Sequence, residues 1–255
     1  MLVSARSFAE YRAMFALTDR DLDQRILDCP GGAASFVAEA GRRGIDAVAA
    51  DREYAVHRVE LGLLVERESR FKRELLLQET ADFTPSWYAD TDDLIRQWTA
   101  NARLFRADIA ARPERYVAGE LPELPFPESS FDLVLSSHLV FSYGNRLGEE
   151  FQRAALLELA RVARREVRLF PLTVYDTGER YPALERLREE LAGAGIGSRV
   201  ERVAYEFQPG DGEMLVLSCA GYRAPPATAP PATAVDPVRW RHREAARPGA
   251  VRPGE

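Results

Sequence analysis

The sequence contains few residues of the kinds that bind metals or form disulfides. It has two cysteines, Cys29 and Cys219, and three histidines, at positions 57, 138 and 242. Two thiols are too few for a disulfide framework or for a structural zinc site, which needs about four ligands. The histidines lie far apart in the chain, without the spacing of metal ligands. We therefore expect no metal centre and no disulfide.

Lysine is almost absent, because Lys72 is the single lysine among 34 basic residues. We attribute the excess of arginine to the base composition of the gene and not to phosphate recognition. The net charge is -6. The segment after Gly221 is basic, with six arginines and three acidic residues. The body of the chain is therefore more acidic than the whole, which argues against a nucleic-acid substrate held by general electrostatics.

Long hydrophobic runs are also missing. No apolar stretch is long enough to span a membrane, and Met1 is not followed by the basic and apolar segments of a signal peptide. We expect a cytoplasmic protein without membrane contact. A chain of 255 residues can build one sizeable core. We expect a helical N-terminal lid (1–24), a main domain (25–220) and a disordered tail rich in proline and arginine (221–255).

Within the proposed lid, residues 7–15 have the apolar spacing of a helix, and Ser7 is placed to cap it. The aromatic residues of this helix either pack on the core or cover a ligand. In the second case, Tyr11 or Arg12 would reach a carboxylate of the ligand.

Residues 25–39 begin the main domain and organise it. Ile26 and Leu27 predict a short buried strand that ends at Asp28, and a loop of small residues then leads to a helix at Phe36. Small residues let a backbone approach a nucleotide-like ligand closely. A loop of this kind also occurs where a helix only packs tightly on a strand, so both interpretations stay open.

A second buried strand is predicted over 45–50, and it ends at Asp51. With the preceding strand and helix it forms a right-handed strand–helix–strand unit with parallel strands. The distance from the loop to Asp51 is about twenty residues, which is typical of a carboxylate that accepts both ribose hydroxyls. The same side chain could instead cap a helix that begins at Arg52.

The segment 54–111 is longer than one helix that connects two strands needs to be. We therefore predict a helical insertion here. Its apolar pattern indicates a long helix, a break at Thr84-Pro85 and a second helix over about 94–105. Three aromatic residues, Trp87, Tyr88 and Trp98, could line a pocket near the ligand, or they could belong to the helical core.

The most informative stretch runs from Tyr116 to His138. A strand ends at Gly119-Glu120, a loop with the sequence Leu-Pro-Phe-Pro follows, and Ser-Phe-Asp-Leu-Val begins another buried strand. With the earlier loop and Asp51, this series resembles the class I S-adenosylmethionine-dependent methyltransferases, particularly the small-molecule, type 11-like branch. The resemblance covers about 25–219.

The resemblance implies an α/β fold with a Rossmann-like sheet of seven strands. Such a sheet is mostly parallel, ends in a C-terminal antiparallel hairpin and has helices on both faces, here with the helical insertion after strand 2. The sequence agrees with a C-terminal hairpin, because strands are predicted over 199–207 and 213–219 and a turn is predicted at 208–212.

The resemblance also implies S-adenosyl-L-methionine as the cofactor. In that family the first loop runs acidic-x-Gly-x-Gly-x-Gly, and this chain has Asp28 followed by Pro30, Gly32 and Ala34. By position, Asp51 would bind the ribose, and Glu120 with the backbone of Leu121 would bind the adenine edge. The implied cofactor-binding residues are Asp28, Cys29, Pro30, Gly31, Gly32, Asp51, Arg52, Glu120, Leu121 and Ser137.

His138 is the candidate catalytic residue. It follows Ser137 at the end of the fourth strand, where the resemblance places the sulfonium and the acceptor. An imidazole can accept a proton from a nucleophile near neutral pH. Alternatively, the ring satisfies the loop backbone or packs on Phe141 and Tyr143.

Together these features predict methyl transfer from S-adenosyl-L-methionine to a small-molecule acceptor. The replaced glycines keep a second interpretation open, in which the fold binds a nucleoside ligand or a protein partner without turnover. A nicotinamide-dependent oxidoreductase is disfavoured by the proline-rich loop and by the predicted C-terminal hairpin. The sequence indicates neither the acceptor nor the oligomeric state.

Overall fold

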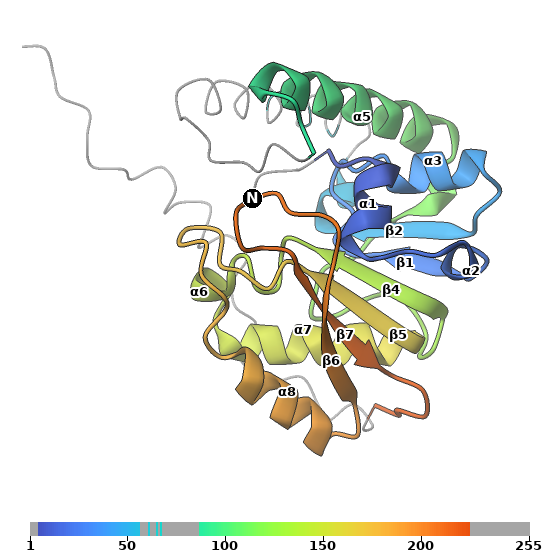
Figure 1. The fold of residues 1–255 in the computed structure, drawn as a ribbon. Coiled ribbons are helices and arrows are strands. Elements are labelled where there is room, and N and C mark those ends of the chain that lie inside the picture. Colours follow the sequence, from blue (N-terminus) through green and yellow to red (C-terminus); the bar gives the residue numbers. More distant parts are fainter. Residues whose placement is uncertain (1–4, 57–60, 62–64, 66, 68–86, 225–255) are drawn as a thin grey trace, which may run out of the picture. The chain divides into compact units, whose positions relative to one another are not determined.

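The computed structural model describes residues 5–56, 61, 65, 67 and 87–224, which belong to one compact unit that ends at Ala224. Its centre is a seven-stranded sheet in the order β3-β2-β1-β4-β5-β7-β6 (Figure 1). The first five strands run parallel, and β7 is antiparallel to both β5 and β6. The predicted sheet is therefore confirmed. The strands are β1 (Ile26–Asp28), β2 (Ala47–Asp51), β3 (Tyr116–Ala118), β4 (Phe131–Ser137), β5 (Ala163–Phe170), β6 (Gly197–Arg202) and β7 (Glu213–Ser218).

Helices cover both faces of this sheet (Figure 1). The group formed by α1, α3 and α5 packs on one face, and α7 and α8 pack on the other. The helices are α1 (Phe8–Met14), α2 (Asp19–Leu22), α3 (Phe36–Arg42), α5 (Thr91–Ala111), α6 (Gly144–Leu147), α7 (Glu149–Val162) and α8 (Leu184–Gly193), with short 3-10 turns η1 (Arg52–Ala55) and η2 (Pro113–Arg115). The second helix of the insertion is confirmed as α5. The first falls almost entirely outside the described residues, as does the tail from residue 225 on.

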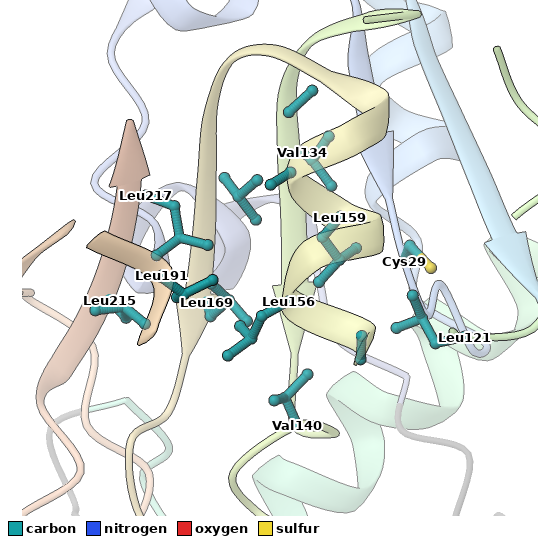
Figure 2. Packing of buried hydrophobic residues seen from close by; sticks show 14 of the residues in the cluster. Cys29, Leu121, Val134, Val140, Leu156, Leu159, Leu169, Leu191, Leu215 and Leu217 are labelled. Carbon is teal, nitrogen blue, oxygen red and sulfur yellow. The ribbon is translucent and has the colours of Figure 1, made fainter. Parts of the chain in front are cut away.

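The sheet separates two hydrophobic clusters, because successive strand residues point to opposite faces. In β1, Ile26 belongs to the cluster under α1, α3 and α5, whereas Leu27 belongs to the cluster under α7 and α8. Figure 2 shows the second cluster, where Leu156 and Leu159 of α7 lie over Val134 of β4. Burial on both faces explains why the parallel strands read as continuous apolar runs in the sequence.

The C-terminal hairpin differs from the prediction at one end. Its first strand, β6, ends at Arg202 and not at position 207, so the connection to β7 is longer than a tight turn. Residues of the predicted strand leave the sheet instead, and the ring of Tyr205 is fully buried against the N-terminal segment. The carboxylate of Asp211 closes this connection by accepting hydrogen bonds from the backbone N–H groups of Phe207 (2.9 Å) and Gln208 (3.1 Å).

The N-terminal helix is held by its own cap. The Ser7 hydroxyl accepts from the backbone N–H of Glu10, and the Glu10 carboxylate accepts from the N–H of Ser7, which is a capping box. The predicted helix and its cap are therefore confirmed. Within the described residues, the structure has no helix of the length and apolarity needed to cross a membrane.

Candidate functional site

The carboxyl ends of four neighbouring strands meet at one edge of the sheet. Strands β3, β2, β1 and β4 are adjacent and parallel, with Asp28 in register with Ala49 and Asp51 in register with Ala118. Asp28 and Asp51 therefore end neighbouring strands, and Glu120 lies two residues beyond β3. Ser137 ends β4, and His138 follows it. The sheet thus brings together the strand ends that the sequence singled out, at the position where open α/β sheets bind ligands.

Asp51 ties the first loop to the end of β2. Its carboxylate is 2% exposed and accepts the backbone N–H of Gly32 on Oδ2 and that of Glu53 on Oδ1, both at 2.9 Å. The second bond caps η1, so the capping role left open by the sequence is confirmed. Burial raises the pKa of Asp51, although the two backbone hydrogen bonds oppose this effect. Each carboxylate oxygen retains a further lone pair that can accept a hydroxyl hydrogen.

The small-residue loop after β1 turns its N–H groups toward β2. Gly31 donates to the carbonyl of Ala50 at 2.9 Å, and the Tyr54 hydroxyl donates to the carbonyl of Gly32 at 2.8 Å. A Cβ atom at position 31 would lie 2.7 Å from the Tyr54 hydroxyl and 2.8 Å from the Cβ of Ala49. Glycine is therefore required at position 31 by close packing. Gly32 has a positive φ of 53°, which glycine adopts without strain.

Asp28 is covered by a tyrosine of the N-terminal helix. The Tyr11 hydroxyl lies 3.0 and 3.1 Å from the two carboxylate oxygens of Asp28 and 3.5 Å from Oγ of Ser137. Burial raises the pKa of Asp28 well above its ordinary value; the bond from Tyr11 lowers it, and the charge of Asp51 raises it further. Tyr11 thus contacts a carboxylate of the protein itself, and Arg12 pairs with Asp19 at 2.9 Å. In this structure both side chains therefore contact carboxylates of the protein itself.

The remaining residues of the predicted cofactor set divide into exposed and buried ones. The Glu120 side chain is 51% exposed, and its Oε1 lies 2.8 Å from Nη1 of Arg52. Pro30 is partly buried. In contrast, the side chains of Cys29 and Leu121 belong to the hydrophobic cluster under α7 and α8 (Figure 2). Any contact of these two residues with a ligand would therefore have to come from their main chains.

His138 is held by its backbone and by Arg6. Its φ is 51°, its backbone N–H donates to the carbonyl of Phe170 at 2.7 Å, and its ring meets the ring of Phe170 edge-on. Its Nε2 lies 3.1 Å from Nη2 of Arg6. Because a guanidinium has only donors, Nε2 accepts this bond and the proton resides on Nδ1. The nitrogen that would serve as a base is thus engaged by Arg6 in this structure.

A buried cluster around Arg6 lies beside His138 and was not predicted from the sequence. Arg6 is 3% exposed, and its Nη1 contacts the Glu10 carboxylate at 3.1 Å and the Tyr205 hydroxyl. The Tyr88 hydroxyl donates to the same carboxylate. Three aromatic rings surround the guanidinium, with centroids 4.8 to 5.7 Å from Cζ: those of Trp98, Tyr205 and Phe207.

The sequence contained one signal for this cluster, the four-residue spacing of Arg6 and Glu10, which is that of an i,i+4 ion pair, although Arg6 precedes the Ser7 cap of α1. It could not show that the pair is buried. The aromatic residues predicted to line a pocket are found here: Trp98 donates from Nε1 to the Tyr88 hydroxyl at 3.2 Å, and Trp87 meets the ring of Tyr205 edge-on. Of these three, the Trp98 ring lies against the guanidinium of Arg6.

Comparison with known proteins identifies one family and one relative. Residues 93–170, from α5 to the end of β5, match the family model described as a methyltransferase domain. An uncharacterized protein of Methanocaldococcus jannaschii is 26% identical over 219 residues, which cover 83% of this chain and 93% of that protein.

Similar solved structures are methyltransferases of low sequence identity. The magnesium protoporphyrin IX methyltransferase of Synechocystis PCC 6803, with bound S-adenosylmethionine, has a TM-score of 0.46 and 13% identity, covering 85% of this chain and 78% of that one. A putative methyltransferase of Haloferax volcanii, in complex with the Trm112 activator, also has a TM-score of 0.46 and 13% identity, covering 86% and 92%.

The side chains at the sheet edge fit S-adenosyl-L-methionine, the cofactor of this family. Its sulfonium and ammonium groups are positive and would offset the repulsion between the buried carboxyl groups of Asp28 and Asp51. Its ribose and adenine carry donors that suit the acceptors of Asp51 and Glu120. Among the described residues, no three His, Cys, Asp or Glu side chains are grouped to hold a metal ion. Residues 93–170 thus match a methyltransferase domain, and the order and direction of the seven strands agree with the fold implied by the resemblance to class I S-adenosylmethionine-dependent methyltransferases.

Proposed function

We propose that this protein transfers the methyl group of S-adenosyl-L-methionine to a small-molecule acceptor. One observation carries the proposal: Asp28 ends β1, Asp51 ends β2 and Glu120 lies two residues beyond β3, and these three strands are parallel neighbours. Asp51 would accept the ribose hydroxyls, Glu120 would accept the adenine amino group, and Asp28 with Ser137 would border the methionine part.

The cofactor supplies an electrophilic methyl group on a positive sulfur that leaves as a neutral thioether. The protein mainly has to align the nucleophile with that carbon and exclude water, and such positioning can supply about 7–11 kcal/mol. His138 would accept the proton of a nucleophile that carries one. A small-molecule acceptor is supported by the acidic body of the chain and by the aromatic side chains gathered beside His138.

Calorimetric titration with S-adenosyl-L-methionine tests the assignment of Asp51. We expect the wild-type chain to bind and Asp51→Asn to bind at least about tenfold more weakly, because one good hydrogen bond to a charged group contributes about 1.5–3 kcal/mol. The matched control is Asp132→Asn, since Asp132 is the second residue of β4 and lies toward the opposite edge of the sheet. Equal affinities of all three proteins would remove the ribose assignment, and no binding by the wild type would overturn the proposal.

A second candidate function is ligand or partner binding without turnover. It is favoured by the contacts that cover the strand ends, in particular the Tyr11 hydroxyl on Asp28, and by Pro30 and Ala34 at two of the three family glycine positions. Release of S-adenosylhomocysteine with a panel of small-molecule acceptors separates the two functions. Cofactor binding without any acceptor-dependent release would favour the second.

A further inference from the structure

The guanidinium of Arg6 has one donor that the described residues leave unsatisfied. Its Nη1 contacts Glu10 and Tyr205, and its Nη2 contacts His138. Its Nε is fully buried and has no hydrogen-bond acceptor in the described part of the chain. A buried N–H group without an acceptor costs about 1–3 kcal/mol and calls for an explanation.

The unsatisfied donor lies on the edge of the guanidinium that suits a carboxylate. In arginine, Nε and Nη2 share one edge of the planar group, and their parallel N–H bonds can bind both oxygens of one carboxylate. Glu10 contacts Nη1, so it does not occupy this edge. Nη2, one of the two nitrogens of this edge, contacts His138, which follows the end of β4.

The surroundings keep Arg6 charged. Burial alone would lower the pKa of the guanidinium, but the neighbouring Tyr205, Glu10 and Tyr88 outweigh it, and the pKa is raised. Aromatic faces also stabilise the positive charge. The free donor on Nε needs a lone pair, which a carboxylate provides and an ammonium group does not.

We propose that the methyl acceptor is a carboxylic acid whose carboxylate binds Arg6 along the edge formed by Nε and Nη2. This inference rests on the proposed function and names its substrate class. The carboxylate would replace His138 as the acceptor for Nη2 and so release Nε2 beside the bound acid. In the transfer, the nucleophile bonds to the methyl carbon, the carbon–sulfur bond breaks with its electron pair moving to sulfur, and the proton of the nucleophile passes to Nε2.

The test is a titration of the full chain, with and without saturating S-adenosylhomocysteine, followed by calorimetry and by tryptophan fluorescence, since Trp98 adjoins Arg6. The probes are acetate, benzoate and succinate, each paired with its neutral amide. The variants are Arg6→Lys and Arg6→Gln. The matched control is Arg12→Gln, since Arg12 is an exposed arginine of the neighbouring helix α1 that pairs with Asp19.

We expect at least one acid to bind saturably to the wild type and to Arg12→Gln. Its affinity should fall at least tenfold in both Arg6 variants, and its neutral amide should bind at least tenfold more weakly. The proposal would be overturned if none of the acids bound saturably. It would also be overturned if the Arg6 variants bound the acid as tightly as the wild type, or if the amide bound as tightly as its acid.

Two features keep this test decisive. Arg6→Lys retains the positive charge but lacks the planar guanidinium. If Arg6→Gln does not fold, this variant alone shows whether the acid needs the guanidinium. Binding of S-adenosylhomocysteine is measured in the same samples. Its absence would count against the proposed function, whereas acid binding in the titration without the nucleoside still reports on Arg6 alone.

Discussion

At the residue scale, Tyr11 joins the N-terminal helix to the end of the first strand through one hydroxyl group. The hydroxyl is within hydrogen-bond distance of both oxygens of Asp28, which is 1% exposed. The ring is stacked on Phe36 of α3, with centroids 4.7 Å apart. The packing of the ring would survive removal of the oxygen, so this contact can be tested by itself.

Replacing Tyr11 by phenylalanine should lower the free energy of unfolding by about 1–3 kcal/mol, because the buried carboxyl group loses a partner. Urea denaturation monitored by circular dichroism measures this change. Tyr175→Phe is the matched control, since that side chain is 44% exposed and its substitution should change stability by no more than about 0.5 kcal/mol. If Tyr11→Phe lowered the free energy of unfolding no more than the control does, the Tyr11 hydroxyl would not stabilise the fold through Asp28.

Asp211, in the connection between β6 and β7, should make stability depend on pH. Burial raises its pKa from the ordinary 3.8 to about 6, against the backbone hydrogen bonds from Gln208 and Phe207. Folding therefore favours the neutral carboxyl group. The contribution of Asp211 to the free energy of unfolding is fully present below the pKa of the unfolded state and is lost as the pH rises through about 6.

Relative to Asp211→Asn, the wild-type free energy of unfolding should fall by up to about 3 kcal/mol between pH 4 and pH 7. Urea titrations of both proteins at four pH values in this range give the difference. A difference that is constant with pH, or that grows in favour of the wild type, would show that the carboxyl group does not titrate in this way.

The sequence predicted the residues at the strand ends but not their partners. Asp28 and Asp51 were identifiable because each follows an apolar run of strand length. The contacts of His138 with Arg6 and of Tyr11 with Asp28 were not identifiable. They join segments up to 132 residues apart, and no local pattern encodes such pairs.

At the element scale, the loop after β1 is fitted against β2 and η1 with no room for a side chain at position 31. We expect Gly31→Ala to lower the free energy of unfolding by about 1–3 kcal/mol, since its Cβ would overlap the Tyr54 hydroxyl and the Cβ of Ala49. The measurement is again urea denaturation.

Gly193→Ala provides the comparison for this loop. Gly193 ends α8, and a Cβ there would meet no atom within 4 Å. The change should be neutral or stabilising by up to about 1 kcal/mol, because alanine restricts the unfolded chain. If both glycine variants were equally stable, the close fit of the loop would be refuted.

The elements themselves were largely predictable, and the exception has a physical cause. The strands and helices of the parallel part follow apolar runs and helical spacing, and they were found close to their predicted positions. The strand expected to end at 207 stops at Arg202. Tyr205 and Phe207 have the composition of a strand, but their rings pack around Arg6 instead of on the sheet. Tertiary packing overrides β propensity here.

At the scale of the whole molecule, the sheet order assembles the proposed site from distant parts of the chain. The family-model match begins at residue 93, whereas Asp28 and Asp51 precede it. Their assignment to the cofactor therefore depends on the neighbouring positions of β1, β2 and β3. The proposed acceptor side would add Arg6 from the N-terminal segment, which contacts Tyr205 of the C-terminal hairpin.

The most direct test of the central claim is a crystal structure of the full chain with S-adenosylhomocysteine. We predict the ribose hydroxyls within hydrogen-bond distance of Asp51 and the adenine amino group within hydrogen-bond distance of Glu120. An adenosyl group bound away from the carboxyl ends of β1, β2 and β3 would contradict it.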